Sequence, residues 1–246
     1  MSDEHHQEHN HYTRLEDLIS CLKMHSLTQL GRFLLPDGLW HCKDDVYYDE
    51  EQHQTNDTLF LTFDDGPNPK TTPYLLEMFE EENIKATFFL VGREVERHSQ
   101  LVREISDAGH VIGNHSQTHL FIPALSVRKL ESEIQRPNHM IEEITGRAPT
   151  LFRPPFGIID KRGADCLKER GMTPVYWGPV PEDWQKIGAC RVVHRVMRQL
   201  TPGALIVLHE LDWNSAQTIK ATREIVKRMK HAGYRFSGIT GGAGAA

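Results

Sequence analysis

Two adjacent carboxylates, Asp64 and Asp65, follow a short apolar run and directly precede Gly66-Pro67. Neighbouring side chains on an extended chain point in different directions, so one carboxylate can bind a metal ion while the other acts as a base toward a water. An Asp-Gly-Pro sequence is also common in solvated turns, and taken alone this segment is more often such a turn.

His115 and His119 lie four residues apart in the polar segment HSQTH. Residues at this spacing share one face of a helical turn, so we expect both imidazoles to lie on such a turn and to face a single cation. Surface helices also carry this spacing by chance. With Asp65, the two histidines form a set that suits Zn²⁺ and other divalent transition metals and leaves positions open for water and substrate.

Two further polar residues follow apolar runs. The segment RPPFG begins at Arg153, and its double proline stiffens a turn from which Arg153 could pair with Asp64. A rigid loop with a surface arginine is the plain alternative. His209 follows the apolar run LIVL, where a histidine is often only a hydrogen-bonded core residue. With a metal site at the same rim, His209 instead fits a general acid.

Strand-like and helix-like segments alternate along the chain and must position these residues. The apolar runs of strand length are Leu59–Phe63, Ala86–Val91, His110–Ile112, Thr150–Arg153, Thr173–Trp177, Ala204–Leu208 and Tyr234–Ser237. Helices are expected from Thr71 or Thr72 onward and over Val95–Ala108, Ser126–Thr145, Lys161–Arg170, Cys190–Gln199 and Ser215–Ala232. This alternation predicts a parallel α/β sheet, doubly wound or closed into a barrel, that binds ligands at the carboxyl ends of its strands.

Length and composition indicate one catalytic domain with a short extension. The 246 residues are 39% hydrophobic and 25% charged, enough for a single substantial core. We expect an extension over 1–57 with a histidine-rich start and a helix within Leu15–Leu35, a catalytic domain over 58–240, and a flexible tail over 241–246. A net charge of −6 and a pI near 6.2 give no basic surface for nucleic acid. The sequence contains no run of 18 apolar residues, so it predicts no membrane span.

The chain start and the cysteines bear on location. The first residues, MSDEHHQEHNHY, contain no apolar run and do not resemble a secretory signal, so a cytoplasmic protein is expected. Cys21, Cys42, Cys166 and Cys190 form no CxxC pair, which fits reduced thiols, although two disulfide bridges remain open.

Five segments in chain order resemble the motifs of one enzyme family. TFDDGP, HSQTH, RPPFG, the pair Asp183-Trp184 and the pair Leu208-His209 are similar to those of the NodB-type polysaccharide deacetylases, carbohydrate esterase family 4. The resemblance covers roughly residues 58–240. It implies a deformed (β/α) barrel of the TIM type with about seven parallel strands.

The resemblance also implies an activity and a site. The activity is a metal-dependent hydrolysis that removes N-acetyl groups from N-acetylglucosamine-containing glycans of the chitin or peptidoglycan type, with Zn²⁺, Co²⁺ or another transition metal as cofactor. The implied roles are Asp64 as base, Asp65, His115 and His119 as metal ligands, His209 as general acid, Arg153 orienting Asp64, Asp183 pairing with His209, and Pro155, Phe156 and Trp184 binding substrate, with the Phe156 N–H near the oxyanion.

Two departures from the family pattern concern the third and fourth motifs. Phe156 stands where tyrosine is usual, and the segment PEDW lacks the more common second aspartate ahead of Asp183. An O-acetyl esterase of the acetylxylan type and a non-catalytic sugar-binding domain remain as alternative functions. The glycan partner is not further specified, and the oligomeric state stays open. Trp177, Trp184 and Trp213 could stack on sugars or pack in the core.

Overall fold

The computed structural model describes residues 57–239, so the expectations for the extension, its helix and the closing tail fall outside the described residues. This part of the chain contains seven strands, as the sequence predicts. They are β1 (Thr58–Asp64), β2 (Thr87–Leu90), β3 (Val111–Asn114), β4 (Leu151–Phe152), β5 (Thr173–Pro174), β6 (Leu205–His209) and β7 (Arg235–Phe236).

The strands form one parallel sheet with the order β5-β4-β3-β2-β1-β6, and β7 pairs with β1. Every strand pair is parallel, so all carboxyl ends meet at one rim. The chain after β5 hydrogen-bonds to β6 through Gly178 N to Leu205 O at 3.1 Å and Val207 N to Pro179 O at 3.0 Å. The sheet therefore curls into a deformed barrel, as predicted. Irregular backbone after β5 bridges its open side.

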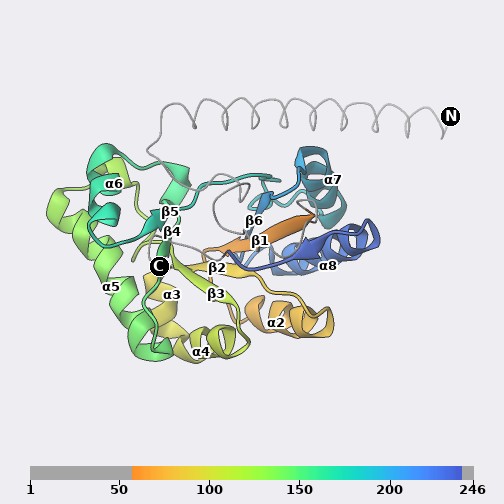
Figure 1. Ribbon diagram of the computed structural model, residues 1–246, viewed down its shortest axis with the longest axis horizontal. Coiled ribbons are helices and arrows are strands. Elements are labelled where there is room, and N and C mark those ends of the chain that lie inside the picture. The colour runs from red at the N-terminus through yellow and green to blue at the C-terminus, as the bar shows by residue number, and fades with distance from the viewer. Residues whose placement is uncertain (1–56, 240–246) are drawn as a thin grey trace, which may run out of the picture.

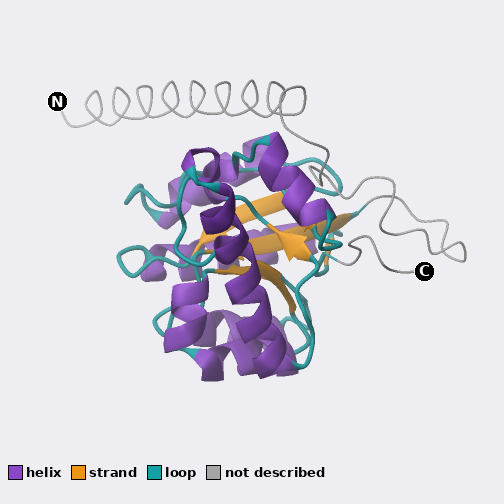
Figure 2. Cartoon of the chain, turned by 90° about the vertical axis from the view of Figure 1, so that its left-hand side faces the viewer, coloured by secondary structure: helices purple, strands orange, loops and turns teal. Residues whose placement is uncertain are grey.

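Seven α-helices lie around these strands within residues 57–239 (Figures 1 and 2). They are α2 (Thr72–Glu81), α3 (Gly92–Arg97), α4 (Ser99–Asp107), α5 (Val127–Thr145), α6 (Lys161–Lys168), α7 (Ala189–Gln199) and α8 (Ser215–His231). Helix α5 contacts α3, α4 and β3, while α7 packs on α8. Among these residues, no helix is both long enough and apolar enough to cross a membrane.

One helix boundary differs from the prediction. The single helix expected over Val95–Ala108 is two helices, because His98 leaves the helical region at φ −132° and ψ 43°. The buried residues Val95, Val102 and Ile105 still follow a helical spacing, so the apolar pattern hides the break. Neither glycine nor proline, the residues that usually interrupt helices, stands at this position.

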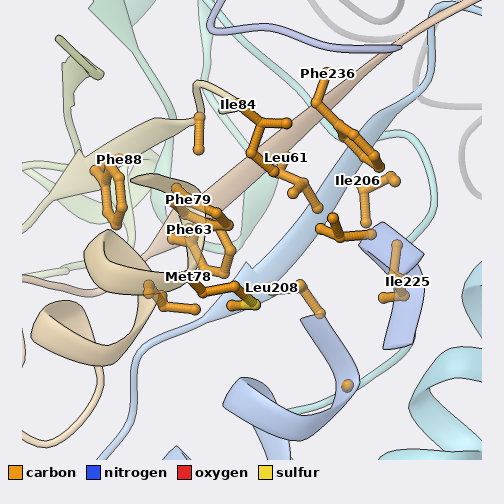
Figure 3. Packing of buried hydrophobic residues seen from close by; sticks show 14 of the residues in the cluster. Leu61, Phe63, Met78, Phe79, Ile84, Phe88, Ile206, Leu208, Ile225 and Phe236 are labelled. Carbon is orange, nitrogen blue, oxygen red and sulfur yellow. The ribbon is translucent and has the colours of Figure 1, made fainter. Parts of the chain in front are cut away.

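The alternation of side chains along β1 separates the core from the site. Leu59, Leu61 and Phe63 point outward and pack against the helices, where Figure 3 shows Phe63 beside Phe79 and Phe88. The ring centroids of Phe63 and Phe88 lie 5.3 Å apart. Successive residues of a strand face opposite sides. Asp64, the last residue of β1, therefore faces the barrel interior at the carboxyl rim.

Two of the four cysteines lie in the described residues. Cys166 is buried and Cys190 is exposed, and both are free. Cys21 and Cys42 lie outside the described residues.

Candidate metal centre and active site

Asp64 is held inside the barrel mouth by a buried arginine. Arg153 Nη1 lies 2.7 Å from Asp64 Oδ1 and 2.6 Å from Thr62 Oγ1, and its guanidinium lies 4.1 Å from the centroid of the Phe89 ring. Burial alone would raise the pKa of Asp64, but the positive charge of Arg153, helped by His115 and His209, lowers it below its ordinary value. Asp64 is therefore an ionised carboxylate in a site almost closed to solvent.

Asp65, His115 and His119 converge beside Asp64. Asp65 Oδ1 lies 3.8 Å from His115 Nε2 and 3.5 Å from His119 Nε2, and the three ligand atoms all lie within 4.8 Å of one another. A tetrahedral ion with bonds of about 2.1 Å holds its ligand atoms about 3.4 Å apart. The donor set and its spacing therefore fit a divalent transition metal.

The protonation of the two imidazoles suits this use. His115 Nδ1 lies 2.6 Å from the carbonyl oxygen of Arg153. A carbonyl only accepts, so Nδ1 carries the proton and the Nε2 lone pair faces Asp65. Burial lowers the pKa of both His115 and His119, which favours neutral rings. Neutral imidazole is the form that coordinates a metal.

The backbone of the HSQTH segment differs from the expected helical turn. Residues 115–119 form no helix, and Ser116 and His119 take left-handed φ values of 67° and 57°. Asn114 Oδ1 accepts a hydrogen bond from Ser116 N at 2.7 Å, and Ser116 Oγ accepts one from His119 N at 2.9 Å. Polar side chains that bond to nearby backbone compete with helix formation. The helix-based prediction was wrong, although its conclusion that both rings share one ligand position agrees with the structure.

Asp183 and His209 form a second charged pair, in which Asp183 is buried and His209 is partly exposed. The Asp183 carboxylate accepts hydrogen bonds from the backbone N–H and from Nδ1 of His209, each at 2.8 Å. Burial lowers the pKa of His209, but the charge and hydrogen bond of Asp183, with the charges of Asp64 and Asp65, raise it to about 9. His209 stands beside Asp64 in the β1–β6 register, so a protonated imidazole and an ionised carboxylate occupy neighbouring strand ends.

A pocket of about 480 Å³ opens over these groups. Its walls are mainly apolar, formed by Pro154, Phe156, Trp177, Val180, Trp184 and Val207. Trp184 stands edge-on to the ring of His209, with the ring centroids 5.2 Å apart, and Phe156 packs against His119 at 4.8 Å. All five sequence motifs thus contribute residues to the lining of the pocket.

One residue expected to line the pocket, Pro155, does not do so. Pro155 is buried and does not line the pocket, because Pro154 occupies that wall and Phe156 turns outward in a left-handed conformation, φ 57°. Trp213 lies beside the mouth, where its Nε1 donates to the carbonyl of Trp184 at 3.1 Å. Pro154 therefore forms the part of the pocket wall that was expected at Pro155.

The model of the polysaccharide deacetylase family matches residues 51–175, which are 125 of the 246 residues. The chain belongs to this family. A peptidoglycan-N-acetylglucosamine deacetylase of Bacillus cereus is 36% identical over 178 residues, 72% of this chain and 83% of that protein. A chitooligosaccharide deacetylase of Rhizobium leguminosarum is 34% identical over 164 residues, 65% and 75% of the two chains. The peptidoglycan deacetylase PgdA of Listeria monocytogenes is 32% identical over 183 residues, 74% of this chain but only 38% of PgdA.

Solved deacetylase structures share the fold. The Bc1960 peptidoglycan N-acetylglucosamine deacetylase superposes with a TM-score of 0.72 at 30% identity, covering 74% of this chain and 86% of that one. A family pseudoenzyme from Bacillus anthracis gives a TM-score of 0.70 at 29% identity, covering 74% and 64%. Because this polysaccharide deacetylase is similar to active and inactive relatives alike, its activity must be argued from its residues.

Several residues that support the deacetylase site escaped the sequence analysis. Glu133 and Glu210 are buried carboxylates. Glu133 accepts from Thr118 in the loop that carries His119, and Glu210 accepts from the Thr72 hydroxyl at the start of α2. Asn214 and Gln217 donate to the backbone carbonyl of Asp183. All four sit in helices or after strands without a motif of their own. The adjacency of Glu210 to His209 was the one signal available from the sequence.

Proposed function

We propose that this chain is a metal-dependent deacetylase that hydrolyses the acetamide of N-acetylglucosamine residues in glycans of the chitin or peptidoglycan type. The observation that carries the proposal is the meeting of Asp64, the triad of Asp65, His115 and His119, and His209 at one rim of the barrel. Amide hydrolysis needs a base, a stabiliser of negative charge and an acid, and the site offers one group for each. The named deacetylase relatives support this class of substrate.

The triad would hold the cation, with Zn²⁺ or Co²⁺ as the metals that best suit two imidazoles and a carboxylate. When bound, such an ion supplies Lewis acidity toward the acetyl carbonyl and makes a nearby water more acidic. Asp64 takes the proton of this attacking water. Arg153 keeps Asp64 ionised and fixes its direction, since their two polar atoms lie 2.7 Å apart.

His209 completes the reaction at the nitrogen. Attack of water on the carbonyl carbon forms a C–O bond, and cleavage of the C–N bond releases acetate and the sugar amine. His209 donates its proton to the departing nitrogen, and Asp183 holds its ring in place through Nδ1, which leaves Nε2 to face the substrate. The opposite protonation states of Asp64 and His209 follow from their opposite charged partners, Arg153 and Asp183.

Part of the apolar pocket wall suits the acetyl group of the substrate. Trp184 and Val207 present hydrocarbon beside His209, which suits the methyl of an acetyl group. We assign the backbone N–H of Phe156 to the developing oxyanion, a contact worth on the order of 3 kcal/mol. Because this role belongs to the backbone, the absence of a tyrosine hydroxyl leaves it intact.

Two rival functions differ from this proposal in a measurable way. A sugar-binding domain needs neither an ionised Asp64 nor a charged His209, and burying both would cost stability without benefit. An O-acetyl esterase would use the same groups on a more reactive bond. One solved neighbour, the Xyl-CE4 domain of a multidomain xylanase, is similar at 26% identity with a TM-score of 0.68 over 74% of this chain and 87% of that domain.

A substrate panel scored for acetate separates these functions. N-acetylglucosamine oligomers, peptidoglycan and acetylated xylan are incubated with the chain, with and without a chelator. We expect acetate from the two N-acetylated substrates, its loss after chelation and its recovery when Zn²⁺ or Co²⁺ is added back. Release from acetylated xylan alone would favour the esterase, and binding without release would favour the sugar-binding domain.

A further inference from the structure

The loop that carries His119 is held in an unfavourable backbone conformation. Ser116 and His119 both take left-handed φ values, a region that costs non-glycine residues of order 1–3 kcal/mol each. Such residues persist only where the surroundings impose them. The loop's own hydrogen bonds join Asn114 to Ser116 and Ser116 to His119, so they brace its first half and its end.

Glu133 braces the middle of this loop from outside. Its side chain projects from α5 and is fully buried. Oε2 accepts the backbone N–H of Thr118 and Oε1 accepts the Thr118 hydroxyl, both at 2.8 Å. Lys129, one turn earlier on α5, lies 2.7 Å from Oε1. Thr118 directly precedes His119, so this contact lies one residue from a triad member.

The charge of Glu133 is consistent with a bracing role. Burial alone would raise the pKa of its carboxyl, but hydrogen bonds from Lys129 and Thr118 lower it below the ordinary value. An ionised carboxylate accepts at both oxygens, and hydrogen bonds to a charged acceptor are roughly twice as strong as neutral ones. Neither Glu133 nor Lys129 lines the pocket, so neither meets the substrate.

We propose that Glu133 is a positioning residue of the metal centre, which sets the place of the His119 imidazole by fixing the Thr118 backbone. The inference rests on the metal centre of the proposed function. Partners that orient a ligand without touching the metal typically change its affinity by about 10–100-fold when they are removed. Loss of Glu133 should therefore weaken metal binding even though all three ligands remain.

The test is Co²⁺ affinity of the full chain, measured by competition with a chromogenic chelator and by the visible absorption of bound Co²⁺. Glu133→Gln keeps the size of the side chain but removes its charge and leaves one acceptor oxygen, so it cannot accept from the Thr118 N–H, the Thr118 hydroxyl and Lys129 as the carboxylate does. We expect affinity to fall about tenfold or more. Glu143→Gln on the same helix is the matched control, because Glu143 is exposed and contacts His139 only on the surface. The control should bind Co²⁺ like the wild type.

Thr118 variants show whether the effect travels through the loop. Thr118→Ser keeps both donors and should keep wild-type affinity, whereas Thr118→Ala loses the hydroxyl contact and should bind more weakly. Combined with Glu133→Gln, Thr118→Ala should add little, because both changes act on one contact. The melting temperature of each variant is also measured without metal. A variant that melts like the wild type but binds Co²⁺ more weakly has a misplaced His119 and is not generally unstable.

Three outcomes are decisive. Wild-type affinity in Glu133→Gln overturns the inference, and so does a full additive loss in the double variant. If Glu133→Gln does not fold, Thr118→Ala carries the test, and wild-type affinity there contradicts the inference. A wild-type chain that binds no Co²⁺ would instead overturn the metal centre of the proposed function.

Discussion

Replacing Asp183 with asparagine should remove the charge that keeps His209 protonated. The Asp183 carboxylate makes two hydrogen bonds to His209, both 2.8 Å long, and lies fully buried beside it. An opposite charge at this distance raises the pKa of an imidazole by about 1–3, which corresponds to about 1.5–4 kcal/mol in favour of the charged ring. Without it, burial favours the neutral ring, which has no proton to give the departing amine.

The magnitude follows from the value near 9 to which the pKa of His209 is raised. If the pKa of His209 falls by about two in the variant, the protonated fraction of His209 at pH 8.5 falls roughly twentyfold. The sign is fixed, because a general acid acts only below its pKa and the alkaline limb of the rate profile must move to lower pH. A bound divalent cation lowers the pKa of His209 in both proteins, so the predicted quantity is the separation between the two profiles.

The assay is acetate release from an N-acetylglucosamine oligomer as a function of pH, with kcat/KM measured for both proteins. Asn214 and Gln217 donate to the Asp183 backbone carbonyl at 3.0 and 2.8 Å, and Asp183→Asn retains these contacts and therefore the loop. Asp165→Asn, at an exposed position of α6 paired with Lys161, is the control and should match the wild type. Superimposed alkaline limbs for Asp183→Asn and wild type would refute the assignment of His209 as the acid.

Two other substitutions address buried charges. Arg153→Gln leaves the Asp64 carboxylate without its partner, so the acid limb of the rate profile should move to higher pH and urea unfolding should show a loss of about 3–5 kcal/mol; unchanged stability would contradict a buried pair. Burial, helped by the charge of Asp65, raises the pKa of Glu210 from 4.5 to about 8, so its favourable contribution is complete below pH 4.5 and is lost as pH rises through 8. Glu210→Gln lacks this titration. The melting temperature of the variant minus that of the wild type should therefore be about 3 °C or more higher at pH 8.5 than at pH 5. If this difference is the same at both pH values, Glu210 is ionised throughout.

The order of strands and helices could be predicted because each element carries a complete local signal. The apolar residues of β1 alternate cleanly, and the same alternation places Asp64 on the inner face. Adjacent motifs at strand ends then meet because parallel strands share one carboxyl rim. Asp64, Asp65, His115, His119 and His209 all follow strand ends in the sequence, and all line the same pocket in the structure.

The features that the sequence did not predict all depend on contacts between distant segments. The spacing of His115 and His119 fits a helix. Hydrogen bonds from the Asn114 side chain, from Glu133 on α5 and from the backbone at the start of α3 hold the loop in another conformation. Pro154 lines the pocket in place of Pro155 because Phe156 takes a left-handed φ. The residue type at position 156 does not predict this conformation. Local patterns do not encode such long-range hydrogen bonds and strained turns.

The protonation of the buried carboxylates was equally hidden. Asp64 and Glu210 are both acidic residues at the ends of neighbouring strands, yet one pKa is lowered and the other is raised to about 8. The difference lies in their partners, since Arg153 supplies a full charge to Asp64 while Glu210 receives only the hydroxyl of Thr72. Such partners are known only once the fold has brought them together.

The most direct measurement compares Asp64→Asn with wild type, each carrying the same measured content of Zn²⁺, for acetate release from an N-acetylglucosamine oligomer. Asparagine keeps the shape of the side chain but cannot take a proton from water. We expect one bound metal in both proteins and a rate at least about a thousandfold lower in the variant. A variant that binds Zn²⁺ and releases acetate at the wild-type rate would contradict the assignment of Asp64 as the base.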